Sequence, residues 1–208
     1  MKTIKLVSTA LLLSFVTSAM AQKMELKSGS FKALSGQKQV NVVYTFDKMD
    51  VGQGKRAMAE PDYIAKKKKE YNEKEAGRGD SWEKAWVADR ENRFFGKFEE
   101  LLNKGMSKQG IVFGRGKSDA KYTLIVQTDM TEPGFNIPMV MKQPSLINLT
   151  IKLVETAAQD KVLGSMTLLG ATGQTFGYGD WDTGVRIQES YAKAGKSFGA
   201  WLPKKGMK

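Results

Sequence analysis

The chain has 208 residues, with 33 Lys and Arg against 22 Asp and Glu, a formal charge of +11, and neither Cys nor His. Without Cys there is no disulfide, thiol nucleophile or thiolate metal site, and without His the Ser-His-Asp and Cys-His arrangements cannot be built. We therefore expect neither a metal nor another cofactor. The length fits one domain.

The first 21 residues are typical of a secretory signal peptide. Lys2 and Lys5 precede an apolar run at 6–16, and Ala19 and Ala21 form an A-x-A cleavage site. The run is too short to span a bilayer, although an uncleaved anchor is the alternative. We expect an exported mature chain, periplasmic or secreted, which carries no lipid because it has no cysteine.

Removing the two signal lysines leaves a mature charge of +9. A basic exported protein is attracted to anionic surface components such as lipid head groups or acidic glycans. The alternative is that the charge serves solubility alone.

After the signal, residues 39–46 (QVNVVYTF) are typical of a strand because Val and aromatic residues dominate. Residues 56–76 are heavily charged. Lys66 and Glu70 lie one helical turn apart there, which favours a solvated helix over an anion-binding lysine patch. We predict a single domain at 22–208 with a charged helical insertion near 56–80.

The next predicted helix runs from Ser81 to about Lys104. Asp80 and Glu83 fit a capping box at its start. Its apolar positions recur at helical spacing and predict a core face. These positions are Val87, Phe94, Phe98, Leu101 and Leu102.

Strand patterns dominate the second half of the chain. Residues 111–113 predict a brief edge strand, and 122–131, 146–155 and 161–171 alternate as strands with one buried face do. The short link between the last two predicts an antiparallel hairpin.

A proline-rich flap, residues 132–145, separates the first two of these longer strands. Its prolines keep it out of the sheet centre. It carries five exposed-looking apolar residues, Phe135, Ile137, Met139, Val140 and Met141. Two interpretations stay open: the flap folds back over the sheet edge, or it binds a partner.

A glycine-rich segment, 173–184, follows the strands. Its aromatic residues Phe176, Tyr178 and Trp181 either plug the end of the core or stack on a sugar ring. Asp180 and Asp182 beside Trp181 are candidate carboxylates for glycan chemistry, although Asp182 equally fits a helix cap. A terminal helix then runs from 182 or 183 to 202, with Ile187, Tyr191, Ala194, Phe198 and Trp201 or Leu202 on one face.

The stretch GRGKS at 114–118 looks like the end of a phosphate-binding loop. The motif requires a glycine where Ile111 stands and a helix after the loop, but a strand pattern follows. We therefore predict a turn that feeds a strand, and we expect neither a nucleotide nor a nucleic acid as ligand.

Several segments resemble a family of envelope domains. They are 119–126 (DAKYTLIV), 147–155 (INLTIKLVE), 160–163 (DKVL) and 192–202 (AKAGKSFGAWL). These resemble the A-D-Y-x-L-x-V, I-x-V-x-L-V-D and G-K-V-L patterns and the closing helix of the TolB N-terminal domain and the periplasmic domain of CsgG. The chain departs from them by its charged insertion, its flap and the missing lipid-carrying cysteine. The resemblance implies an envelope setting and an assembly or docking role, and it transfers no catalytic residue.

The pattern as a whole predicts an α/β or α+β domain, with a mixed, mainly antiparallel sheet of about four strands on two long helices. We expect a non-enzymatic, exported cell-envelope protein that acts as a protein-binding or assembly module. Its partner would be an envelope protein or an anionic surface component, and a homo-oligomer stays open. The alternative is a secreted glycan-binding or glycan-processing protein.

Overall fold

The computed structural model describes residues 22–137, 139–173 and 182–208. The predicted signal peptide lies outside these ranges. So do four residues singled out from the sequence, Phe176, Tyr178, Asp180 and Trp181.

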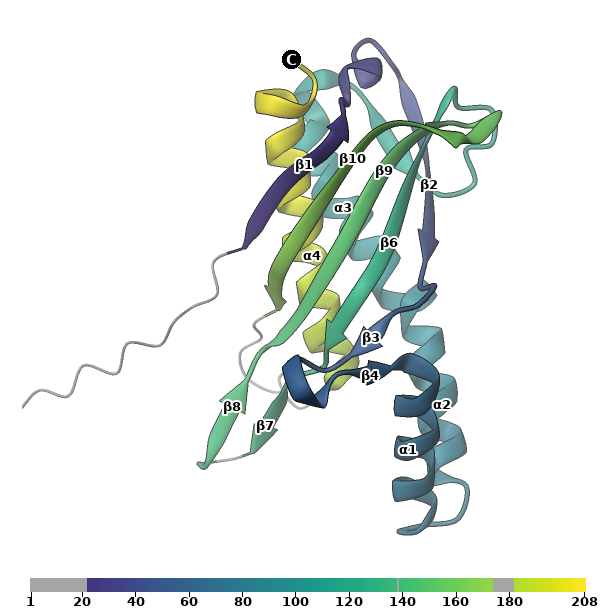
Figure 1. The fold of residues 1–208 in the computed structure, drawn as a ribbon, viewed down its shortest axis with the longest axis vertical. Helices are drawn as coiled ribbons and strands as arrows, with labels where there is room; N and C mark the ends of the chain where they lie inside the picture. Colours follow the sequence, from purple (N-terminus) through teal and green to yellow (C-terminus); the bar gives the residue numbers. More distant parts are fainter. Residues whose placement is uncertain (1–21, 138, 174–181) are drawn as a thin grey trace, which may run out of the picture.

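A mixed sheet forms the centre of the molecule (Figure 1). Its strand order is β1 (Lys23–Gly29), β10 (Ala158–Gly173), β9 (Ser145–Glu155), β6 (Tyr122–Glu132), β2 (Gln39–Thr45) and β5 (Val112–Gly114). The first four are antiparallel neighbours, whereas β2 runs parallel to both β6 and β5. Two short strands, β3 (Asp50–Val51) and β4 (Met58–Ala59), extend the sheet beside the end of β6.

The predicted fold class is confirmed, but the sheet has more strands than the four expected. The largest omission is β1, whose sequence KMELKSG is mostly polar and exposed, so it lacks the apolar alternation that revealed the others. It pairs with β10 at the sheet edge.

In the part of the chain that the structure describes, four α-helices accompany the sheet: α1 (Glu60–Asn72), α2 (Arg78–Asp89), α3 (Phe95–Met106) and α4 (Thr183–Trp201). A π-helical turn, Arg90–Phe94, joins α2 to α3. Both α3 and α4 cover one face of the sheet, while α1 and α2 form a hairpin that projects beyond it (Figure 1).

The core lies between the sheet and the pair α3 and α4. Phe98 and Leu102 of α3 and Tyr191 and Phe198 of α4 are fully buried, as the sequence pattern predicts. Val87 is an exception, with 47% of its surface exposed. The π-helical turn Arg90–Phe94 has more residues per turn than an α-helix. Helical spacing counted back from Phe94 therefore does not identify the buried face of α2, where Trp86 is buried in place of Val87.

The charged insertion contains the helix α1, which packs against α2 as a helical hairpin. On α1 the charged groups pair within a turn, at Lys67–Glu70 and Lys69–Glu73. Asp80 is not the predicted cap. Because α2 begins at Arg78, Asp80 falls inside its first turn, where its carboxylate pairs with Lys68 on α1.

The two core helices approach each other backbone to backbone. A Cβ placed on Gly195 of α4 would lie 2.3 Å from the carbonyl oxygen of Phe98, and one on Gly105 of α3 would lie 2.7 Å from the carbonyl carbon of Gly199. The crossing therefore excludes side chains at these positions.

Replacing Gly195 by Ala should destabilise the protein by about 1–3 kcal/mol, because the added methyl forces the helices apart. The matched control is Gly96→Ala in α3, where a Cβ meets no atom within 4 Å. That change should raise stability by up to about 1 kcal/mol through helix propensity. Urea unfolding followed by circular dichroism measures both. Equal shifts in the two variants would contradict the close crossing.

Candidate functional site

The flap is a β-hairpin of β7 (Phe135–Ile137) and β8 (Met141–Gln143) that projects from one end of the sheet (Figure 1). At its tip Ile137, Met139, Val140 and Met141 are 47, 105, 73 and 58% exposed. This contradicts the interpretation in which the flap folds back over the sheet edge. The structure thus brings four of the five predicted residues together on an apolar surface, the hairpin tip.

Phe135, the fifth predicted residue, lies at the base of the hairpin and not at the tip. It is half-buried and lines a cavity of about 330 Å³ between the hairpin and α1. The cavity is lined by apolar residues such as Val51, Met58 and Tyr63, and by the charged residues Arg56, Lys66, Lys67 and Glu132. Phe135 is therefore not part of the exposed hairpin tip.

A buried arginine of α4 holds the base of the hairpin. Arg186 is only 4% exposed, and its guanidinium donates to the carbonyl oxygens of Pro133 and Gly134, both at 3.3 Å. Gly134 has a φ of +64°, and a Cβ there would lie 2.4 Å from the carbonyl oxygen of Gln143, so glycine is required. On the returning strand the Ser145 hydroxyl donates to the Arg186 carbonyl at 2.6 Å. Both ends of the hairpin are thereby fixed to α4.

The hairpin tip contains a backbone outlier. The Val140 amide donates to the Ile137 carbonyl at 3.1 Å, and Met139 within this turn has a φ of +56°. Glycine or asparagine normally occupies such a left-handed position, because a bulky side chain there costs on the order of 1 kcal/mol. A strained and fully exposed methionine is a local feature that folding alone does not favour.

A second cavity, of about 490 Å³, lies on the face of the sheet opposite α3 and α4. Its floor is a row across five strands, in which Lys23 pairs with Leu169, Asn148 with Met130, and Met130 with Asp50. The glycine-containing loop at 52–57 forms its wall. The cavity could hold a small amphipathic molecule, but the Asn148 oxygen already accepts from the Gly170 amide and Lys23 already pairs with Glu25.

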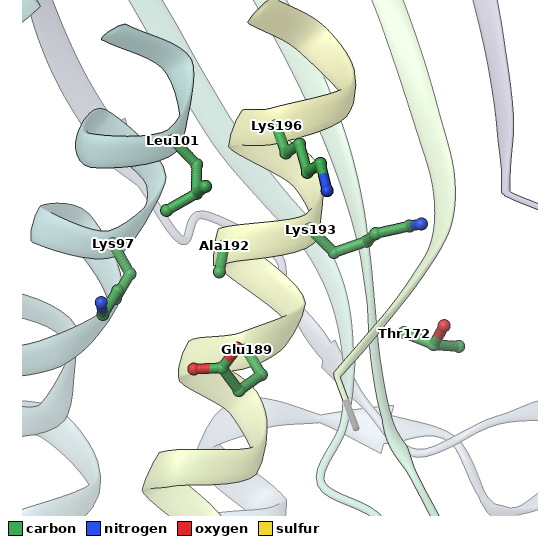
Figure 2. Close-up of a pocket in the computed structure, with 7 residues that line it drawn as sticks. All are labelled: Lys97, Leu101, Thr172, Glu189, Ala192, Lys193 and Lys196. Carbon is green, nitrogen blue, oxygen red and sulfur yellow. The ribbon is translucent and has the colours of Figure 1, made fainter. Parts of the chain in front are cut away.

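A groove of about 520 Å³ separates α3 and α4 on their outer side. Figure 2 shows Lys97 on α3 and Glu189 on the side of α4 that faces α3, whereas the side chains of Lys193 and Lys196 extend to the other side of α4. Lysines 97 and 193 are distant in sequence, so no charge run indicated this groove. It can attract an anion, although Glu189 offsets one of the three charges and Lys97 pairs with Glu100 at 2.8 Å.

Asp182 has a structural role, which removes one carboxylate from the predicted glycan site. Its Oδ1 accepts from the amides of Gly184 and Val185 at the start of α4, and its Oδ2 accepts from Arg93 at 2.7 Å. Burial acts to raise the pKa of Asp182, but these hydrogen bonds outweigh it and hold the pKa below its usual range. The carboxylate therefore caps the helix.

The GRGKS segment forms the predicted turn. Gly116 has a φ of +72°. The amide of Lys117 donates to the Asn41 side chain, so this amide does not face an open phosphate-binding loop. The chain then enters β6.

Within the described residues, no group of three or more Asp and Glu side chains could hold a metal ion, and no helix is long and apolar enough to cross a membrane.

Comparison with known proteins gives distant structural neighbours alone. No family model and no curated protein matches the chain. PelC from Paraburkholderia phytofirmans, solved as a dodecamer, is 13% identical and covers 86% of this chain and 98% of its own, with a TM-score of 0.39. Protein XCC0632 from Xanthomonas campestris is 9% identical and covers 80% of this chain and 83% of its own, with a TM-score of 0.38.

A putative neuraminyllactose-binding hemagglutinin homolog from Helicobacter pylori is also similar. It is 13% identical and covers 87% of this chain and 90% of its own, with a TM-score of 0.33. At these TM-scores the neighbours assign neither a family nor an activity. The site is therefore argued from the residues of this chain.

Replacing Arg186 by Met should loosen the hairpin, because the carbonyl groups of Pro133 and Gly134 lose a buried donor. An unsatisfied buried group costs about 1–3 kcal/mol. We expect faster hydrogen exchange across 135–143 and a lower unfolding midpoint, measured by mass spectrometry and urea titration. Arg78→Met, at an exposed position of α2, is the control and should change neither. Unchanged exchange in the Arg186 variant would show that the hairpin does not depend on this arginine.

Proposed function

We propose that the chain is an exported, non-enzymatic cell-envelope protein that binds a partner protein through its hairpin tip. One observation carries the proposal: four apolar side chains stand at the end of a hairpin whose base is fixed by a buried arginine. Exposed apolar groups at a fixed position are typical of a protein-binding surface. A partner that offers an apolar pocket would remove them from water.

The hairpin favours a protein partner because its two short strands form a sheet of their own. The sheet of β7 and β8 has only these two strands, so each has an outer edge among the described residues. A partner strand can hydrogen-bond to such an edge while its pockets take the apolar side chains. A second copy of this chain is one protein that could do so, which keeps the homo-oligomer within the proposal.

The envelope setting is also proposed, from the signal-peptide pattern and the resemblance to the TolB and CsgG domains. The four segments that carry this resemblance lie in or lead into β6, β9, β10 and α4. The glycan alternative has no comparable support, since Asp182 caps α4.

Replacing Met139 by Asn should separate binding from folding. Asparagine tolerates the left-handed backbone, so the free energy of unfolding should stay unchanged or rise by up to about 1 kcal/mol. Partner affinity should fall by about tenfold or more, because burying a methionine side chain contributes roughly 1.5–3 kcal/mol. Thermal unfolding and a binding titration measure the two effects.

The partner needed for that titration is found by a photo-cross-linking residue placed at Val140, with the same residue at Val112 as the control. Val112 is 52% exposed on β5, away from the hairpin. A partner that cross-links from position 140, and is lost after Met139→Asn but retained after Val112→Ser, supports the proposal. Equal cross-linking from both positions, or a collapse of stability in the Asn variant, would contradict it.

A further inference from the structure

The positive charge of this chain is concentrated in three stretches, 26–46, 101–118 and 190–208. Together they hold twelve Lys and Arg residues and no Asp or Glu. The rest of the chain from residue 22 onward holds 19 basic and 22 acidic residues. The positive net charge of the chain from residue 22 onward therefore comes entirely from these three stretches. Basic residues that served solubility alone would be distributed along the whole chain.

Tertiary contacts bring parts of all three stretches to one end of the molecule. The amide of Phe31, beside the 3₁₀ turn Lys32–Leu34, donates to the Gly206 carbonyl in the π turn Leu202–Gly206 at 3.1 Å. The close approach of Gly105 to Gly199 places the end of α3 against the end of α4. The 3₁₀ turn Ser107–Gln109 continues from α3 at the same end.

Five exposed lysines lie on these turns and at the end of α3, and we call this surface the basic end. They are Lys32, Lys104, Lys108, Lys204 and Lys205. Across the described residues, none of the five forms an ion pair with a carboxylate. The acidic groups that precede Lys104 on α3 are already paired, Glu99 with Arg115 and Glu100 with Lys97.

We propose that the basic end binds the surface of an anionic phospholipid bilayer. None of the described cavities is lined by these five lysines, so the end suits an extended surface better than a small ligand. All five are lysines, whose ammonium groups act as point charges and need no fixed bidentate geometry. Such groups suit a fluid layer of head groups, where each lysine near the surface contributes roughly fivefold in affinity.

The two surfaces point away from each other. In Figure 1 the C-terminus lies at the opposite end of the molecule from the hairpin of β7 and β8. A bilayer bound at the basic end therefore leaves the hairpin tip free for a protein. This inference is independent of the proposed function, because vesicle binding can be measured without the protein partner.

The experiment is sedimentation of the mature protein with vesicles of phosphatidylcholine, with and without phosphatidylglycerol. The test variant carries Lys108→Gln, Lys204→Gln and Lys205→Gln. The control carries Lys48→Gln, Lys74→Gln and Lys84→Gln, which are exposed lysines outside the basic end. Both variants lose the same net charge, and their unfolding midpoints are checked first.

We expect binding that requires phosphatidylglycerol and weakens with added salt. It should fall by about a hundredfold in the test variant and by less than fivefold in the control. Met139→Asn should bind vesicles like the unmodified protein. Equal loss in both lysine variants, or binding to phosphatidylcholine alone, would overturn the proposal. So would binding to soluble polygalacturonate with no binding to vesicles, since the ligand would then be an acidic glycan.

Discussion

The close crossing of α3 and α4 is the constraint on which the rest of this structure depends. The sheet has one apolar face, and two helices bury it only if Gly195, Gly199 and Gly105 let their backbones meet. The aromatic side chains of both helices, such as Phe98 and Phe198, then face the sheet rather than each other's backbone. A single methyl group at the crossing would move α4, and α4 positions both ends of the molecule.

At its first turns α4 determines where the hairpin points. Water could satisfy the guanidinium of Arg186 if the side chain were exposed. The side chain is buried instead, and its guanidinium donates to backbone carbonyls of the hairpin base. Burying a charge is costly unless its hydrogen bonds are satisfied, so this arrangement favours one orientation of the hairpin. The tip in turn holds an exposed methionine at a left-handed position. Rigid support beneath a strained apolar tip is more consistent with a binding element than with a loose loop.

At its last turns α4 determines where the charge gathers. The π turn after α4 contacts the 3₁₀ turn that follows β1, while α3 ends beside Gly199. Lysines separated by as many as 173 positions, from Lys32 to Lys205, are thereby brought to one end. The molecule therefore separates an apolar surface from a cationic one, and the same helix sets the location of each.

The sequence by itself determined the fold class and most element positions, because strand alternation and helical spacing follow from burial of one face. It also identified the flap residues Ile137, Met139, Val140 and Met141 as a candidate surface, because prolines and apolar residues occur together in one short segment. Only the tertiary structure decided that Phe135 lies at the base of the hairpin, that Val87 is exposed and that Asp182 is a cap. It also decided where the lysines lie. Those outcomes depend on a π-helical turn, a buried arginine and contacts between segments far apart in the chain, and none of these leaves a local pattern.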